Sequence, residues 1–326
     1  MDLGRDRLII GILTWNGYEL ARACLNSLSR LAGWPIPVVV LDNGSREPEG
    51  ERLAAEFGPP VEAVTLPQNQ LVSGGYNALI RAAAERGARH VLLLNDDTII
   101  NDPAMLDRLQ AAAGPDVATV GPLVLNDDDS LFSAGGVVEA WSGRSRHLRR
   151  HQMPSRDKPY EVSWIDGSCM LVSIDAACRV GGLDPAFVST WEDVDWCTRS
   201  RAQGYRCLVE PRTTIRHLRG QTISSYESDR NHLRNRILFA RRHADWPHTV
   251  TTALWFAFLT LPRQTIRSLP SLERLRRVAS ATSAAVGWNV SDAMQRRSWH
   301  RPATGPDVCV TPSTSPTDAA AAVKSR

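Results

Sequence analysis

Two groups of carboxylates in this 326-residue chain have the residue types and spacing to carry out chemistry. In the first group, Asp96 and Asp97 directly follow the apolar run Val91 to Leu94. Adjacent acids at the end of a strand repel each other, and a hard divalent cation with oxygen ligands would relieve that repulsion and bind a diphosphate. The alternative for this pair is a capping role at the start of a following helix. The pair therefore predicts a metal site, with a helix cap as the structural alternative.

The second group is Trp191-Glu192-Asp193-Val194-Asp195-Trp196, in which three acids stand beside two tryptophans. Aromatic faces and carboxylates together suit a hydroxyl-rich ligand such as a sugar. On a helix, Glu192 and Asp195 would share a face, whereas Asp193 would point elsewhere and could act alone as a base. The alternative is that these acids complement the dipole at a helix N-terminus.

A third segment, Asn69 to Asn77, contains the pair Gly74-Gly75 just before a helix predicted from Ala78 to Arg86. Glycines at a helix N-terminus allow backbone amides to approach an anion. The segment has neither a GxGxxG nor a P-loop pattern, so it predicts neither dinucleotide nor ATP binding. An anionic ligand at this loop is the remaining functional interpretation.

The first 125 residues alternate short apolar runs with helical patterns, and these elements must position the acids. Short, continuously apolar runs bounded by Gly, Pro, Asn or Asp are typical of buried strands. Strands separated by helices indicate βαβ units and a parallel sheet, whose ligands bind at the carboxyl ends of the strands. The predicted strands are Leu8 to Leu13, Pro37 to Leu41, Val61 to Leu66, Val91 to Leu94 and Ala118 to Leu123.

Polar residues follow three of these strands. Any one of these groups could be an ordinary turn, but three groups at one edge of a sheet favour a binding site. The groups are Thr14-Trp15-Asn16, Asp42-Asn43-Gly44-Ser45 and Asn95-Asp96-Asp97.

The pattern changes after Leu125. We expect a catalytic domain over residues 1–222, a helical region over 223–300 and a disordered tail over 301–326, the tail being rich in Thr, Ser, Pro and Ala. Within these limits the sequence predicts a surface excursion from Asn126 to Arg150, strands from Ser163 to Ser173 and Arg206 to Val209, a helix from Asp193 to Gln203, a long helix from Ser224 and an apolar helix from Val250 to Leu261.

Composition excludes several classes of protein. A net charge of +3 is too small to indicate nucleic acid binding, and basic residues interleaved with aromatics are not found. None of the six cysteines forms a CxxC pair, so we expect neither structural zinc nor a disulfide framework, but reduced thiols in a cytoplasmic protein. The charged N-terminus predicts no signal peptide, and no apolar run reaches the 18 residues of a transmembrane helix.

In order and spacing, these segments resemble the GT-A fold glycosyltransferases of family 2, especially the bacterial rhamnosyltransferase-like branch. The resemblance runs from Ile9 to about His243 and implies an α/β fold with a Rossmann-like, mostly parallel sheet and a C-terminal helical appendage. Besides the segments above, it rests on Gly181 to Phe187, His217 and Arg234-Asn235.

The resemblance also implies roles for residues at matching positions. Thr14 and Trp15, where most relatives have Tyr in place of the Trp, would hold the base, and Asp42 would read it. Asp96 would lie near the ribose, and Asp97 with His217 would bind the cofactor, Mg²⁺ or Mn²⁺. Asp193 would be the catalytic base. The other residues expected at the donor are Asn16, Asn69, Gly74, Gly75 and Asn77, and those expected at an acceptor or phosphate are Trp191, Glu192 and Arg234.

The implied reaction is a direct displacement that inverts the anomeric centre of a dTDP- or UDP-linked sugar, with rhamnose suggested by the branch. The acceptor would be a glycan, a lipid-linked intermediate or a small molecule. The segment from Trp246 to Arg277 resembles helices that lie on a membrane surface, which would place the enzyme at the inner face of the plasma membrane. Packing on the catalytic domain and a dimer contact are equally acceptable interpretations of that segment. Arg230, Arg234 and Arg236 could bind phosphate or form a solvated helix face.

Two other functions compete with this hypothesis. A sugar-1-phosphate nucleotidylyltransferase would have a Gly-rich loop with a basic residue after its first strand, where this chain has Trp15-Asn16-Gly17. A catalytically inactive carbohydrate-binding or scaffold protein could retain the fold, but it would not need Asp97, Asp193 and His217 together. The sequence leaves the donor sugar, the base, the acceptor and the oligomeric state open.

Overall fold

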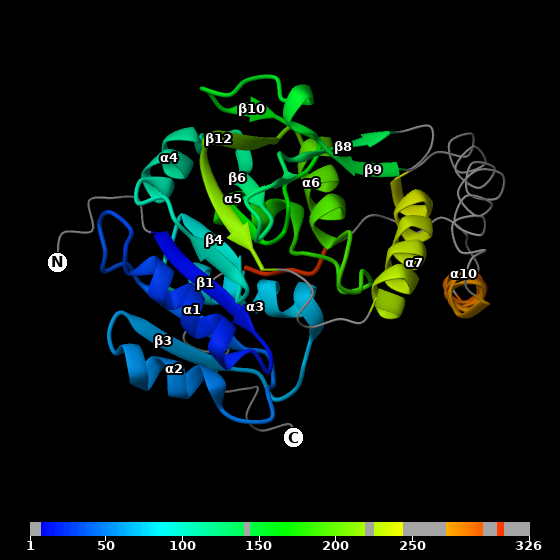
Figure 1. Cartoon of the computed structure of the whole chain (residues 1–326), viewed down its shortest axis with the longest axis horizontal. Helices are drawn as coiled ribbons and strands as arrows, with labels where there is room; N and C mark the ends of the chain where they lie inside the picture. The colour runs from blue at the N-terminus through cyan, green and yellow to red at the C-terminus, as the bar shows by residue number, and fades with distance from the viewer. Residues whose placement is uncertain (1–7, 140–143, 219–224, 244–271, 296–304, 310–326) are drawn as a thin grey trace, which may run out of the picture.

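The computed structural model describes residues 8–139, 144–218, 225–243, 272–295 and 305–309. Its centre is a mixed ten-stranded sheet in which β5 and β7 pair at the side of the main path β10-β12-β6-β11-β4-β1-β2-β3. The chain passes from α1 and α2, in blue, to α7 and α10, in yellow and orange, at the other side (Figure 1). The strands of this sheet are β1 (Leu8–Thr14), β2 (Val38–Asp42), β3 (Val61–Thr65), β4 (His90–Asn95), β5 (Thr98–Ile100), β6 (Val117–Leu125), β7 (Leu131–Ser133), β10 (Tyr160–Glu161), β11 (Cys169–Ser173) and β12 (Arg206–His217).

The N-terminal part of the sheet consists of the parallel strands β3, β2, β1 and β4, as predicted. Alternate residues of a strand face opposite sides of the sheet. Ile10 and Ile12 of β1 belong to one hydrophobic cluster, and Ile9 and Leu13 belong to another on the opposite face. Because both faces are buried, the strands read as continuous apolar runs and their polar residues collect at the carboxyl ends.

Helices cover both faces of this sheet. Cys24 and Leu25 of α1 pack in one cluster, whereas Tyr76 of α3 and Trp196 of α6 pack in the other. The helices are α1 (Tyr18–Leu28), α2 (Glu49–Phe57), α3 (Leu71–Glu85), α4 (Met105–Ala112), α5 (Ile174–Val180), α6 (Glu192–Ala202), α7 (Ser225–His243) and α10 (Leu272–Gln295), with a short 3-10 helix η1 (Arg150–Gln152).

Helix α3 begins at Leu71, earlier than the predicted start at Ala78. The glycine pair therefore lies inside the helix and not before it. A Cβ on Gly75 would lie 2.3 Å from Cδ1 of Leu13 in β1, so this glycine allows close packing of the helix on the sheet. The predicted helix start at Ala78 is therefore wrong, and the two glycines do not precede the helix.

The second half of the sheet differs from the prediction in two places. Strand β11 begins only at Cys169, and it runs antiparallel between β4 and β6. The segment Asn126 to Arg150, predicted as a surface excursion, forms β7 and a separate hairpin of β8 (Gly136–Glu139) and β9 (Arg144–His147). This hairpin brings side chains from the excursion to the pocket described below.

The described residues of the C-terminal region are helical, as predicted. Helix α7 packs on α10, where Leu233 shares a small hydrophobic cluster with Ala281 and Ala285. The apolar segment Val250 to Leu261, and with it most of the proposed membrane-surface segment, lies outside the described residues. No helix in the described ranges combines the length and the apolar character needed to cross a bilayer.

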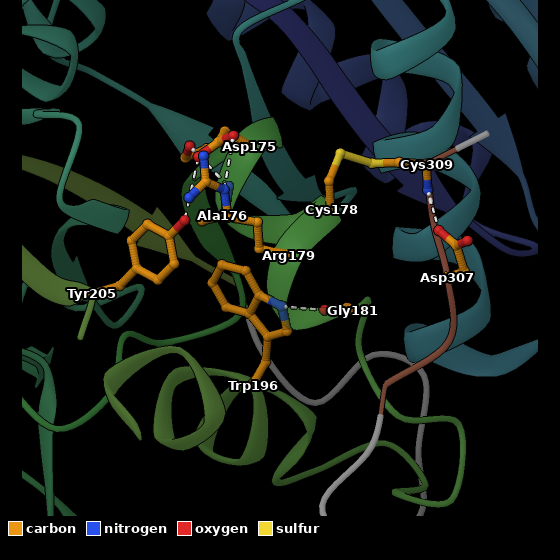
Figure 2. Close-up of a disulfide and its surroundings, with 10 residues drawn as sticks. Asp175, Ala176, Cys178, Arg179, Gly181, Trp196, Tyr205, Asp307 and Cys309 are labelled. Carbon is orange, nitrogen blue, oxygen red and sulfur yellow. Dashed lines mark hydrogen bonds and ion pairs between the residues drawn. A yellow bond between two sulfur atoms is a disulfide. The ribbon is translucent and has the colours of Figure 1, made fainter. Parts of the chain in front are cut away.

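The prediction of reduced thiols is wrong for two cysteines. Cys178 of α5 forms a disulfide with Cys309 (Figure 2). The segment 305–309, predicted as part of a disordered tail, packs against the fold: Val308 is fully buried, and the amide of Gly182 donates to the carbonyl of Pro306 at 2.7 Å. The sequence separation of 131 residues and the lack of a CxxC pattern hid this pairing from sequence analysis. The thiols of Cys24, Cys169, Cys197 and Cys207 are free and buried.

Candidate active site

A pocket of about 790 Å³ lies at the carboxyl ends of β1 and β4. One wall comes from these strand ends and the other from the start of α6, with α7 and the β8–β9 hairpin closing the sides. The predicted site residues that line it are Thr14, Trp15, Asn69, Asp96, Asp97, Trp191, Glu192, Asp193 and His217.

Asp97 and His217 meet because β5, directly after Asp97, pairs with the end of β12. In that antiparallel ladder His217 stands opposite Thr98. The amide of Leu218 donates to the backbone carbonyl of Asp97 at 2.9 Å. Nε2 of His217 consequently lies 3.0 Å from Oδ1 of Asp97.

This pair fits a divalent cation. Oδ1 of Asp97 is buried and makes no hydrogen bond to any described residue, although Nε2 of His217 is close. Two ligands about 2.1 Å from an octahedral ion and at right angles lie about 3 Å apart, which is the separation found here. No group of three or more His, Cys, Asp or Glu side chains in the described ranges could hold a metal. A Mg²⁺-type site with one carboxylate, one imidazole and substrate phosphates agrees with both observations.

Asp96 contacts the end of β1. Its Oδ2 accepts a hydrogen bond from Oγ1 of Thr14 at 2.9 Å. Burial raises the pKa of Asp96 to about 7, and the charge of Asp97 adds to this shift. Near neutral pH both the ionised and the protonated form are therefore populated. The ionised form can accept a hydrogen bond from a hydroxyl group, and the protonated form can donate one.

Glu192 and Asp193 line the same pocket at the start of α6. Oδ2 of Asp193 accepts from the amide of Gly167 at 3.0 Å, and its Oδ1 accepts from the amide of Val194 at 2.7 Å. Burial raises the pKa of Asp193 to about 7, with a further contribution from the charge of Asp166. Burial also raises the pKa of Glu192, whose Oε2 accepts no hydrogen bond from the described residues. A half-buried carboxylate that titrates near neutral pH has the properties of a general base.

Three predicted donor residues lie outside the pocket wall and make hydrogen bonds within the protein. Asp42 is fully buried and accepts from the amides of Ser45 and Gly50. The side chain of Asn16 accepts from the amide of Arg46, so it links the loops after β1 and β2. Asn77 exchanges two hydrogen bonds with the backbone of Leu183.

The other predicted residues outside the pocket wall are Gly74, Gly75 and Arg234. The guanidinium of Arg234 donates to the carbonyl of Ala186 at 2.8 Å and lies over the ring of Trp288. Arg234 therefore joins α7 to the loop before α6 and to α10 and does not line the pocket. Arg230 lines the pocket, and Arg236 is buried.

Part of the pocket wall is aromatic, and no sequence motif predicted it. The ring of His147 lies 4.5 Å from that of Phe132 and 4.8 Å from that of Trp164, and all three line the pocket. These residues come from β7, β9 and the loop before β11, so no local pattern joins them. Asp166 was accessible to sequence analysis, because the polar run Asp166-Gly167-Ser168 interrupts the strand predicted there. Asn43, Asn95 and Arg230, which belong to groups predicted to bind a ligand, also line the pocket. The remaining pocket residues, for which no individual role was predicted, are Leu13, Leu71, Val72, Ser145, Gly167, Ser168, Val188, Ser189, Thr190, Val194, Asn231 and His232.

Comparisons with known sequences identify the family to which this chain belongs. The model of the family described as glycosyltransferase like family 2 matches residues 7–236. The N-acetylglucosaminyl-diphospho-decaprenol L-rhamnosyltransferase of Mycobacterium tuberculosis is 25% identical over 278 residues, which are 74% of this chain and 86% of that protein. The O-antigen biosynthesis protein RfbC of Myxococcus xanthus is 27% identical over 61% of this chain and 16% of its own length.

Solved structures share the fold at low identity. GalNAc-T7 with UDP, GalNAc and Mn²⁺ aligns with a TM-score of 0.62 and 11% identity over 89% of this chain and 58% of that one. The mannosyltransferase PcManGT of Pyrobaculum calidifontis, in complex with GDP-Man and Mn²⁺, aligns with a TM-score of 0.54 and 15% identity over 90% and 81%. Together with the family match, these likenesses confirm the predicted fold. The chain belongs to glycosyltransferase family 2, has the GT-A fold, and is a nucleotide-sugar glycosyltransferase of the rhamnosyltransferase-like type.

Proposed function

We propose that this enzyme transfers a sugar from a nucleoside diphosphate to an acceptor hydroxyl with inversion, and that Asp193 is the base. One observation carries the proposal: a single pocket has the Asp97–His217 pair on one wall and the half-buried Asp193 on the other. A donor held at the first wall would present its anomeric carbon toward the second.

Asp97 and His217 would hold a divalent cation. When bound, the cation would offset the negative charge that develops on the departing diphosphate. Trp15, which is 39% exposed at the strand end, offers an aromatic face to the base. Thr14 and Asp96, joined by a hydrogen bond, offer polar atoms to the nucleoside.

Asp193 would remove the proton of the acceptor hydroxyl as its oxygen attacks the anomeric carbon. The bond from that carbon to the diphosphate oxygen breaks on the opposite face, and the electron pair leaves with the nucleoside diphosphate. The proton ends on Asp193, so a covalent enzyme intermediate is not required. The hydrogen bond from Gly167 fixes Oδ2 of the base.

The relatives suggest the substrates. We propose a dTDP- or UDP-linked donor, with rhamnose as the sugar, because the name of the mycobacterial relative specifies a rhamnosyl transfer. The same name specifies a lipid diphosphate acceptor, so a lipid-linked glycan at the inner face of the plasma membrane is the proposed acceptor class. Solved relatives contain Mn²⁺, which with Mg²⁺ is the proposed cofactor.

Binding of dTDP, UDP and GDP to the full-length protein, with and without Mg²⁺ or Mn²⁺, tests the donor site. We expect metal-dependent binding of one diphosphate, and we expect Asp97→Asn to weaken it at least tenfold. Asp128→Asn removes the same charge from an exposed turn, where among the described residues the carboxylate accepts hydrogen bonds from Ser130, and it should leave binding unchanged. If none of the three diphosphates binds with either metal, the transferase proposal fails and a scaffold role replaces it.

A further inference from the structure

The loop between α5 and α6, residues 181–191, leads directly to the proposed base. Near its end, Ser189 and Trp191 have φ angles of 59° and 72°, on either side of Thr190. The left-handed region is costly for residues with a Cβ, and it persists only where surrounding contacts enforce it. The α5–α6 loop therefore needs an external support just before Glu192 and Asp193.

Asn235 of α7 supplies this support. Its side chain is fully buried, and Nδ2 donates to the carbonyl of Thr190 at 2.7 Å and to that of Val188 at 3.0 Å. A carboxamide NH₂ has two hydrogens, and both point to the segment around Ser189, where Oγ1 of Thr190 is a third acceptor at 3.2 Å. Its Oδ1 accepts from Nη1 of Arg234 at 2.7 Å, which fixes the orientation of the amide.

Neighbouring residues of α7 contact the same loop. Arg234 donates to the carbonyl of Ala186, and Nε1 of Trp191 donates to Nδ1 of His232 at 3.2 Å. Because an indole N–H only donates, Nδ1 of His232 is the acceptor, and the proton of the neutral ring is on Nε2. Phe239 packs on Trp191 with ring centroids 5.2 Å apart.

Charged groups fasten α7 to both sides of this loop. Arg242 forms ion pairs with Asp184 in the loop and with Asp195 in α6. Nε2 of His243 lies 2.8 Å from Oδ1 of Asp195, whose other oxygen binds Arg199. In Figure 1, α7 in yellow stands beside the green loop that leads into α6.

We infer that Asn235 is a positioning residue for transfer: by holding the segment 188–191, which contains the left-handed Ser189 and Trp191, it sets where α6 begins and hence where Asp193 meets the acceptor. The inference rests on the proposed function, because sugar transfer is one of the three quantities that its test measures. The predicted domain boundary at residue 222 places α7 in a C-terminal appendage. With this role for Asn235, α7 is part of the catalytic domain.

Asn289 of α10 provides a matched control. It is also a fully buried asparagine, and its Nδ2 donates to the carbonyls of Arg234 and Ala285 at 3.1 and 3.0 Å. Among the described residues, its hydrogen bonds to other elements join α10 to α7, and none reaches the α5–α6 loop. Asn289→Ala therefore removes similar bonds from the same helix pair without releasing the strained segment.

The test compares full-length Asn235→Ala and Asn289→Ala in three measurements. These are transfer from dTDP-rhamnose to an octyl N-acetylglucosaminide, binding of dTDP with Mn²⁺, and hydrogen exchange of the amides of residues 186–195. For Asn235→Ala we expect kcat to fall about 100-fold, the loss that a displacement of about 1 Å causes, with the Kd for dTDP within twofold. Its amides at 186–195 should exchange at least tenfold faster, whereas Asn289→Ala should keep both kcat and exchange within threefold.

Equal kcat in wild type and Asn235→Ala, or equal losses in both variants, would overturn the inference. If Asn235→Ala does not fold, the isosteric Asn235→Asp replaces the donating NH₂ by an oxygen, and the same separation of kcat from Kd is expected. Absence of transfer by the wild type would count against the proposed function, while the exchange measurement would still decide the role of Asn235.

Discussion

The two walls of the pocket are built in different ways. The donor wall stands on the ends of β1 and β4, whose backbones are fixed by parallel pairing inside the sheet. The acceptor wall begins at a loop with two left-handed residues, and its geometry depends on contacts from α7. A strand end in the middle of a sheet keeps its position with little help, whereas a strained loop needs a second element to hold it. Substitutions on the acceptor wall should therefore change turnover, and those on the donor wall should change binding.

Asp193→Asn gives the largest expected effect on this comparison. Because the amide cannot accept the proton of the acceptor, kcat should fall by about 10²–10⁴, the usual contribution of a general base. The Kd for dTDP with Mn²⁺ should stay within twofold, since Asp97 and His217, and not Asp193, would hold the cation and the diphosphate. Steady-state transfer and calorimetric titration measure the two quantities. A parallel loss of dTDP binding would show that the walls do not act separately.

The disulfide ties residues 305–309 to α5, just before the α5–α6 loop, and so it reinforces the acceptor side. Cys309→Ser should lower the free energy of unfolding by about 2–4 kcal/mol, because closing a long loop restricts the unfolded chain. Urea unfolding with and without dithiothreitol measures this. Reductant should destabilise the wild type and leave the variant unchanged. A wild type that is indifferent to reductant would argue against the bond.

The pH dependence gives a smaller effect. Asp193 accepts a proton only when it is ionised, and its pKa is raised to about 7 by burial. Transfer should therefore fall about tenfold for each pH unit below that value and level off above it. The pH profile of kcat from 5.5 to 8.5 measures this, with dTDP binding recorded at each pH. A flat profile would remove Asp193 from the role of base.

The donor wall was largely accessible from the sequence, because its signals are local. Apolar runs ending in Thr14-Trp15 and Asp96-Asp97 predicted both the strands and the edge at which polar residues gather, and the structure confirms that arrangement. Adjacent residues on one strand end need no long-range contact to be close. The glycine pair Gly74-Gly75 shows where a local pattern is ambiguous. Glycine is required both where a helix packs closely on a strand, as Gly75 does against Leu13, and where backbone amides bind an anion, so the pattern alone does not distinguish the two.

The sequence by itself determined the parallel strands β1 to β4 and the carboxylates at their ends, since these depend on local periodicity and on burial. Tertiary structure decided which distant residues meet. The β5–β12 pairing brings His217 to Asp97, and the packing of α7 brings Asn235 to the carbonyls of Val188 and Thr190. The disulfide likewise joins cysteines 131 residues apart. Each of these contacts depends on the path of the chain between its partners, and neither residue type nor local spacing encodes that path.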